Sequence, residues 1–153
     1  MLAKEIMKSE VITLSPEATI TEIARLMVDK DISGLPVVDG DNRLLGVVSE
    51  RDLMCKDVKL EEPSVLDLCI WSALGSREIY AYKDSFRKYR AKTAAEIMTS
   101  PAITVDENED VSKVGNLMYT RRIKRIFVTR DEKLVGVISR SAFVKLLLDA
   151  ENE

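Results

Sequence analysis

An internal repeat restricts the fold of this chain more than any other feature of its sequence. The segment that begins at Ala3 recurs, with a single-residue deletion near Gly40, as the segment that begins at Ala94. Identical residues at matching places include these pairs: Glu5 and Glu96, Ile6 and Ile97, Met7 and Met98, Ile12 and Ile103, Gly46 and Gly136, and Ser49 and Ser139. Two such copies predict two similar units that pack about a pseudo-twofold axis and share a cleft. We therefore expect the functional site in that cleft.

Each copy is expected to fold as β-α-β-β-α, which makes the fold class mixed α/β (α+β). The first copy predicts these elements in order: a strand at 11–14, a helix capped by Thr19 and ending near Lys30, strands at 35–38 and 44–48 around a hairpin turn, and a helix that begins at Ser49. The second copy predicts a helix capped by Asp110, strands at 126–128 and 134–138, and a closing helix at 141–148.

Three parts are expected along the chain: a first repeat at 1–56, a helical inter-repeat segment at 57–92, and a second repeat at 93–153. In the middle part, Ser64 and Gly75 are placed to begin and end a helix. The residues that follow place an aromatic stripe on one helix face: Ile79, Tyr82, Phe86 and Tyr89. The stripe either packs on the protein's own core or forms a docking surface. The basic residues beside it are expected to be a solvated face: Arg87, Lys88, Arg90 and Lys92.

Composition excludes several classes of function. With 153 residues and 46% hydrophobic content, the chain is expected to form one compact module. A net charge of −3 argues against nucleic acid as a partner. The sequence has no run apolar enough to span a membrane, so a cytoplasmic protein is expected. With no histidine and only two cysteines, we expect no metal site, no cofactor and no catalytic residues, and hence no enzyme.

The segment ISGLPVVD at 32–39, followed by GVVSERD at 46–52 within a tandem repeat, resembles a pair of CBS domains. This family takes its name from cystathionine β-synthase, and the pair is called a Bateman module. The resemblance implies a regulatory fold, often a homodimer, that binds adenosine-containing ligands in the clefts between its repeats. It covers most of the chain apart from the inter-repeat segment.

The stretch from Gly46 to Asp52 resembles the ribose-binding motif of that family. A carboxylate at Asp52 can accept hydrogen bonds from both hydroxyls of a ribose, and the Ser49 hydroxyl can assist. Val48 and Arg51 belong to the same stretch and are included in the predicted site. A second interpretation of Ser49 and Asp52 stays open, because the same spacing at a strand-to-helix junction also forms a capping box.

The second copy keeps the glycine and the serine of this motif, but Ala142 stands where the aspartate is expected. Loss of the carboxylate removes two charge-assisted acceptors, worth about 1.5–3 kcal/mol each. We therefore expect a second, degraded cleft that binds a nucleoside poorly, lined by Ile12, Ile32, Ser33, Ser139 and Ala142.

The family resemblance implies that each site is composite, with the partner repeat supplying its first strand and the residues before its second strand. Carried over by position, Ser49 and Asp52 would share a cleft with these residues: Ile103, Ile123, Lys124 and Arg125. Lys124 and Arg125 would contact phosphate groups. Alternatively, these cations are a solvated helix end, and the isoleucines are plain core.

We interpret the chain as a regulatory ligand-sensing module that binds AMP, ADP or ATP. One alternative ligand is S-adenosylmethionine or a related adenosyl compound, and another function is dimerisation without a ligand. A homodimer is expected because helical faces would leave apolar residues with limited cover, namely Met27, Val28, Leu117, Met118 and Leu146 to Leu148. The sequence does not name the regulated protein.

Overall fold

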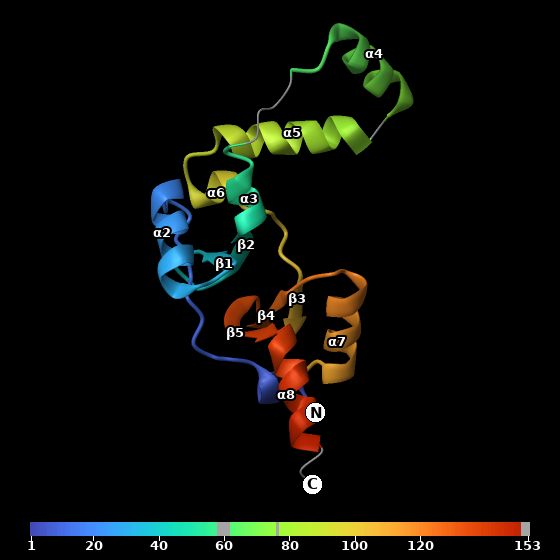
Figure 1. Ribbon diagram of the computed structural model, residues 1–153. Helices are drawn as coiled ribbons and strands as arrows, with labels where there is room; N and C mark the ends of the chain where they lie inside the picture. Colours follow the sequence, from blue (N-terminus) through green and yellow to red (C-terminus); the bar gives the residue numbers. More distant parts are fainter. Residues whose placement is uncertain (58–61, 76, 151–153) are drawn as a thin grey trace. The chain divides into compact units, whose positions relative to one another are not determined.

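Two compact units make up the computed structural model, which describes residues 1–57, 62–75 and 77–150 (Figure 1). The first-repeat unit comprises Leu14–Val37 and Val47–Thr99. The second-repeat unit comprises Met1–Thr13, Val38–Gly46 and the chain from Ser100 onward. Residues 1–13, at the start of the first sequence repeat, therefore belong to the second-repeat unit. Residues 94–99, at the start of the second sequence repeat, belong to the first-repeat unit.

The first-repeat unit contains the following elements: α2 (Ile20–Lys30), most of β1 (Gly34–Val38), the end of β2 (Leu44–Ser49), α3 (Glu50–Met54), α4 (Val65–Leu74), α5 (Arg77–Arg90) and α6 (Ala94–Ile97). Strands β1 and β2 pair in a two-stranded sheet. Buried side chains of α2, the two strands and α6 form one core, which includes Ile23, Leu35, Val37, Val48 and Ile97. Helix α6 enters this core because its Ala94 and Ile97 are fully buried.

The second-repeat unit contains these elements: α1 (Ala3–Ile6), β3 (Thr104–Asp106), α7 (Val111–Thr120), β4 (Arg125–Arg130), β5 (Lys133–Ser139) and α8 (Arg140–Ala150). Its sheet has the order β3-β4-β5, with β3 parallel to β4 and β4 antiparallel to β5. Side chains of the sheet and α7 form the core, together with Ala3 of α1. The expected β-α-β-β-α order is confirmed in this unit, and so is the mixed α+β class.

The structure has no strand at 11–14, so the prediction of a strand there is wrong. Only Leu14 forms a bridge, parallel to Val37, with the Leu14 amide 2.8 Å from the Pro36 carbonyl oxygen. Proline has no amide hydrogen, so β1 cannot donate the hydrogen bond that would extend the ladder toward Ile12. The matching residue of the second repeat is Phe127, and there β3 pairs over three residues.

Side-chain caps set the helix boundaries as expected. The Thr19 hydroxyl accepts from the Glu22 amide, and Glu22 accepts from the Thr19 amide at 2.7 Å. This backbone hydrogen bond, assisted by the Thr19 hydroxyl, lowers the pKa of Glu22. Ser64 begins α4 in the same way, and Asp110 accepts from the Ser112 amide at 2.8 Å to begin α7.

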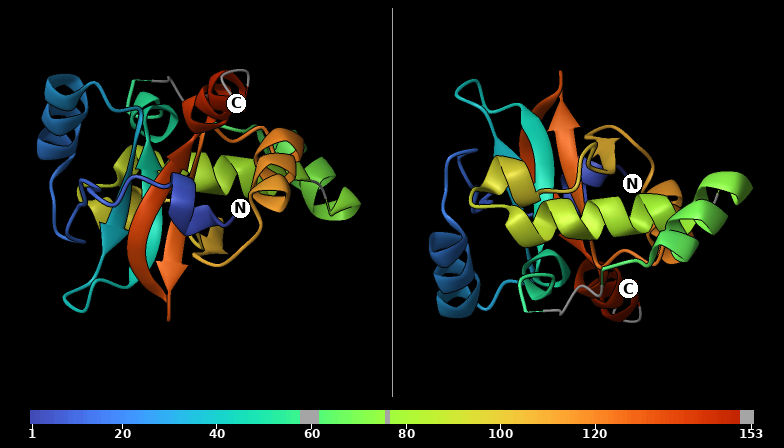
Figure 2. Two further views of the ribbon diagram at one scale, coloured as in Figure 1. Left: turned by 90° about the horizontal axis from the view of Figure 1, so that it is seen from below. Right: turned by 90° about the horizontal axis from the view of Figure 1, so that it is seen from above.

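Helices α4 and α5 form the inter-repeat segment. Gly75 ends α4 in the left-handed conformation, with φ of 59°. Part of the aromatic stripe packs locally, since the Tyr82 ring lies 6.2 Å from Trp71 of α4 and 6.2 Å from Phe86. Phe86 is still 41% exposed. Helix α5 lies beside α6, as both views of Figure 2 show.

Candidate functional site

The junction between β2 and α3 carries the predicted ribose-binding pair. The Asp52 side chain turns back toward the preceding strand, and its Oδ2 accepts from the Ser49 amide at 2.7 Å and from the Ser49 hydroxyl at 3.0 Å. Asp52 is only 5% exposed. The aspartate half of the predicted capping box is thus formed, because Asp52 satisfies the Ser49 amide at the start of α3, whereas the Ser49 side chain makes no cap hydrogen bond to the helix.

The other carboxylate oxygen of Asp52 is held by α5. The Lys88 ammonium donates to Asp52 Oδ1 at 2.5 Å and to the Thr99 hydroxyl at 3.0 Å. The Thr99 hydroxyl is itself 3.4 Å from Asp52 Oδ1. Lys88 is 8% exposed, so the expectation that it belongs to a solvated face is wrong. A buried carboxylate requires a partner charge, and Lys88 supplies it from 36 residues along the chain.

These contacts fill the hydrogen-bonding capacity of Asp52. A carboxylate offers about four lone-pair positions. Two donors from Ser49 occupy Oδ2, while Lys88 and Thr99 occupy Oδ1. A ribose diol that binds Asp52 must therefore displace donors that are already present.

Helix α5 has further attachments near Lys88. The Arg87 guanidinium donates to the carbonyl oxygens of Glu96 and Met98 and to Asp84 at 2.8 Å. Asp84 lies 3.4 Å from the Lys88 ammonium. Burial alone would raise the pKa of Asp84, but the Arg87 hydrogen bond and the charges of Lys88 and Arg87 lower it overall. Asp84 is therefore a second anionic partner for Lys88.

The other residues predicted for this site fall in different surroundings. Val48 is fully buried in the core, whereas Arg51 is exposed. In the second-repeat unit, Ile103 is 43% exposed, Lys124 is exposed, and Ile123 and Arg125 are half-buried. A site formed by residues of both units stays a prediction.

The start of α8 fixes the backbone near the predicted phosphate contacts. The Arg140 amide donates to the Lys124 carbonyl oxygen at 3.2 Å. The Arg140 side chain donates to the Ile123 carbonyl oxygen at 3.1 Å. The residues before β4 are thus attached to the β5-α8 junction of their own unit.

At the degraded position, Ala142 lines a pocket of about 510 Å³ in the second-repeat unit. The Ser139 hydroxyl lies 2.6 Å from the Ser141 hydroxyl, where Ser49 instead contacts a carboxylate. The two units share one feature of backbone pairing. Lys8 forms an antiparallel β-bridge with Val137, and Thr99 forms the same kind of bridge with Val47. Of the other residues expected at this cleft, Ile12 is 37% exposed, and Ile32 and Ser33 are half-buried in the first-repeat unit.

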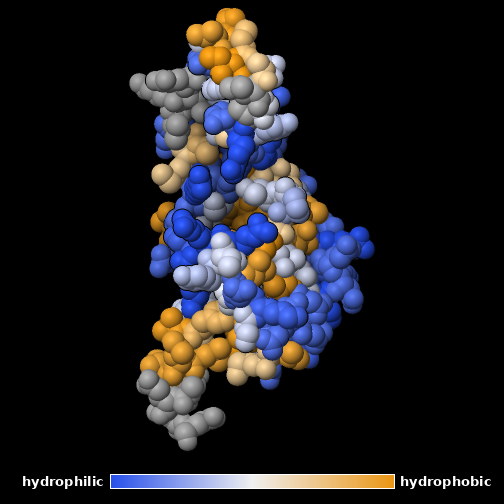
Figure 3. Space-filling model, turned by 90° about the vertical axis from the view of Figure 1, so that its right-hand side faces the viewer, coloured by the Kyte–Doolittle hydropathy of each residue, from blue (hydrophilic) through white to orange (hydrophobic). Residues whose placement is uncertain are grey.

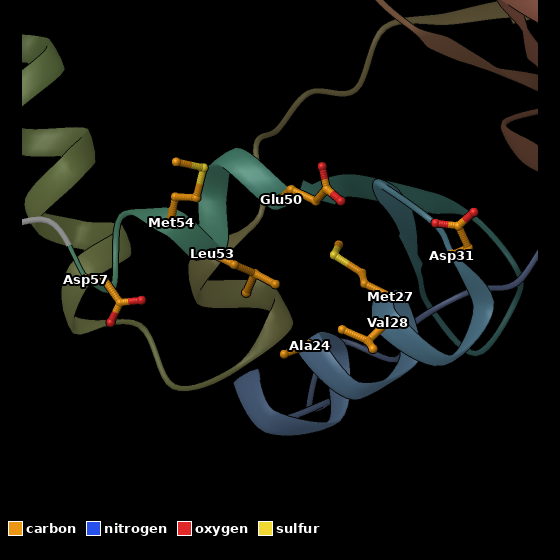
Figure 4. A pocket seen from close by; sticks show the side chains of 8 residues that line it. All are labelled: Ala24, Met27, Val28, Asp31, Glu50, Leu53, Met54 and Asp57. Carbon is orange, nitrogen blue, oxygen red and sulfur yellow. The ribbon is translucent and has the colours of Figure 1, made fainter.

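A further pocket of about 490 Å³ lies on the first-repeat unit between α2 and α3. Its apolar part includes Met27 and Val28 of α2 and Leu53 and Met54 of α3, shown in Figure 4. Its acidic part consists of these side chains: Asp31, Glu50 and Asp57. This pocket was not predicted, because the sequence does not show which apolar residues of α2 and α3 stay exposed.

The family model for the CBS domain matches this sequence twice, at residues 3–58 and 94–149. The chain belongs to the CBS domain family. A relative with 28% identity is uncharacterized protein MJ1426 of Methanocaldococcus jannaschii, and the match covers 97% of this chain and 92% of that protein. The inter-repeat helices α4 and α5 lie outside both matched segments.

Two solved structures share the fold of this CBS pair. CBSX2 of Arabidopsis thaliana, solved in complex with AMP, has a TM-score of 0.74 and 22% identity, with 98% of each chain covered. The CBS domain pair of protein MJ0100, in complex with 5′-methylthioadenosine and S-adenosyl-L-methionine, has a TM-score of 0.67 and 24% identity, again with 98% of each chain covered.

Proposed function

We propose that this CBS pair is a regulatory module that senses an adenine nucleotide, with Asp52 as the ribose-binding residue. The observation that carries the proposal is the Ser49–Asp52 junction, where a carboxylate and a hydroxyl are fixed side by side at the end of β2. AMP in the complex of CBSX2, which has the same fold, supports an adenosine-containing ligand. Lys124 and Arg125 are the proposed phosphate contacts.

A regulatory role without catalysis is part of the proposal. The chain contains no histidine. Within residues 1–57, 62–75 and 77–150, no three His, Cys, Asp or Glu side chains are placed to hold a metal ion. We propose no resident cofactor, and the adenine compound acts as a ligand whose presence is transmitted to a regulated protein.

Assembly as a homodimer is also proposed. Two of the apolar residues expected to lack cover are buried instead, since Met27 is 5% and Met118 is 3% exposed. Other apolar side chains of that set remain exposed, including Val28 at 80% exposure and Leu147 at 70% exposure. Such exposed apolar side chains on helices favour a protein interface. Light scattering should give twice the chain mass, and a monomer at tens of micromolar would contradict this.

In the part of the chain that the structure describes, each helix is too short or too polar to span a lipid bilayer.

Two other functions have specific support. S-adenosylmethionine would use the same Asp52 carboxylate, and the MJ0100 pair was solved with that compound. Dimerisation without a ligand is favoured by the internal contacts that already fill Asp52. A thermal-shift panel of adenosine, AMP, ATP and S-adenosylmethionine separates these functions, because a pure dimerisation module responds to none of them.

The decisive test compares two aspartates that each accept hydrogen bonds from the amide and the hydroxyl of a serine three residues earlier. At the start of α4, the Asp67 carboxylate accepts from the Ser64 amide at 2.9 Å. Asp52 accepts from the Ser49 amide at the start of α3 in the same way. Asp52→Ala should weaken adenosine and AMP alike by about 2–4 kcal/mol, since two hydrogen bonds to the diol are lost. Asp67→Ala should leave both affinities unchanged. Equal affinity of wild type and Asp52→Ala in calorimetry would refute the ribose assignment.

A further inference from the structure

We propose that Lys88 is an internal competitor for the ribose diol at Asp52, and that ligand binding transfers the Lys88 ammonium from Asp52 to Asp84. This inference rests on the proposed function, because it concerns the regulation of the same carboxylate. It assigns a role to α5, which lies outside the two family matches.

A ligand can replace some contacts of Asp52 more readily than others. The Ser49 amide and hydroxyl are three residues away and are positioned by the local chain, so they persist while α3 is folded. Lys88 and Thr99 approach Oδ1 from distant parts of the sequence. Two diol hydroxyls therefore take the place of these two donors.

The displaced Lys88 ammonium has a second carboxylate within reach. Lys88 is 8% exposed, and an ammonium without a partner is unfavourable in such a place. Asp84 is one helical turn away on α5, only 3.4 Å from the ammonium, and its side chain is 51% exposed. Movement toward Asp84 keeps Lys88 paired and brings it closer to water.

Transfer of the ammonium changes how α5 is attached to the rest of its unit. The Lys88–Asp52 ion pair is a direct attachment between α5 and α3. Other attachments of this end of α5 include those made through Arg87 to the segment that contains α6, and through Lys56 to the carbonyl oxygens of Tyr89 and Ala91. Loss of the buried ion pair loosens α5 without detaching it. Ligand occupancy is thereby reported to the inter-repeat helices.

Helix α4 packs against α5. Figure 3 shows apolar side chains gathered on α4, and Val65 and Leu66 are 78% and 69% exposed. A change in the position of α5 would therefore change how this apolar surface is presented.

The test uses the whole chain and adenosine, which has no phosphate to attract the freed Lys88. Lys88→Met keeps the aliphatic stem and removes the competing charge. Calorimetry should show adenosine binding roughly tenfold tighter or more, since one charge-assisted hydrogen bond no longer has to be broken. Lys83→Met changes an exposed lysine of the same helix and should leave the affinity unchanged. Equal or weaker binding by Lys88→Met overturns the inference and leaves the proposed function standing.

Asp84→Asn provides a second variant, at a half-exposed side chain, that leaves the Lys88–Asp52 pair in place. It removes the receiving carboxylate, so adenosine should bind several-fold more weakly. In wild type, saturating adenosine should speed amide hydrogen exchange in α5, whereas in Lys88→Met exchange should already be fast. Adenosine that binds wild type without changing α5 exchange overturns the inference alone. If neither wild type nor Lys88→Met binds adenosine or AMP, the proposed function is overturned as well.

Discussion

Asp52 serves two purposes at the scale of single residues. It caps α3 through Ser49, and it neutralises Lys88 in a buried place. A lowered melting temperature of an Asp52 variant is therefore expected whether or not the residue binds ribose. Only ligand affinity, measured in the folded protein, distinguishes a binding role from a capping role.

The stability of Asp52→Ala follows from its burial. Removal of the carboxylate takes away the nearer partner of the Lys88 ammonium, and loss of one member of a buried pair costs about 3–5 kcal/mol, of which Asp84 at 3.4 Å recovers a part. Asp67→Ala removes only an exposed cap, which costs about 1 kcal/mol. Urea unfolding of both variants provides the comparison. Similar losses in the two variants would show that the Lys88–Asp52 pair contributes little to the folded state.

A second ion pair predicts a dependence of stability on pH. Arg130 donates two hydrogen bonds to Glu107, and they lower the pKa of that carboxyl. A carboxyl with a lowered pKa stabilises the fold above its unfolded pKa of about 4.3. That contribution is lost as the pH falls through the folded pKa. The difference in urea midpoint between wild type and Arg130→Met should therefore shrink from pH 6 to pH 3. A constant difference over that range would contradict the electrostatic origin.

At the scale of elements, sequence patterns predicted what depends on local contacts. Thr19, Ser64 and Asp110 begin helices as expected, because capping uses residues only two or three positions away. The missing strand at 11–14 shows what local sequence patterns do not predict. Apolar residues there predicted a strand, but pairing depends on the donor at Pro36, which lies in another element.

The candidate site shows the same limit. The motif identified Ser49 and Asp52 from their spacing, and the structure places them in contact. Lys88 was missed because its position on α5 suggested a solvated face. Its contact with Asp52 depends on how α5 packs, which residue periodicity within one helix does not report. A buried aspartate needs a partner charge, but the burial of Asp52 is itself a property of the fold.

Gly136 of β5 leaves space for the N-terminal segment that contains Met7 and Lys8. A Cβ at this position would lie 2.4 Å from Met7 Sδ and 3.1 Å from the Lys8 carbonyl oxygen. Gly136→Ala should therefore destabilise the protein by about 1–3 kcal/mol through overpacking. Gly40→Ala is the matched control, since nothing lies within 4 Å of its added Cβ. Chemical denaturation should separate the two variants, and equal midpoints would mean that the N-terminal segment can move aside without loss.

At the scale of the whole molecule, the two repeats differ in the one group that is proposed to bind ribose. The first repeat has Asp52 at its β2-α3 junction, and the second has Ala142 at the equivalent β5-α8 junction. Both junctions keep a serine and a bridged backbone segment beside the strand. A chain built from two similar units is thus expected to respond to its ligand through only one of them.

This asymmetry predicts a stoichiometry of one adenosine per chain, and it can be reversed by a single substitution. Ala142→Asp would place a carboxylate beside Ser139 in a pocket of about 510 Å³, which leaves room for the larger side chain. Each charge-assisted hydrogen bond it offers is worth about 1.5–3 kcal/mol. Calorimetry should therefore give one site for wild type and two for Ala142→Asp. Two equal tight sites in wild type would show that the carboxylate does not decide binding. A variant that keeps one site would show that the second repeat lacks more than its aspartate.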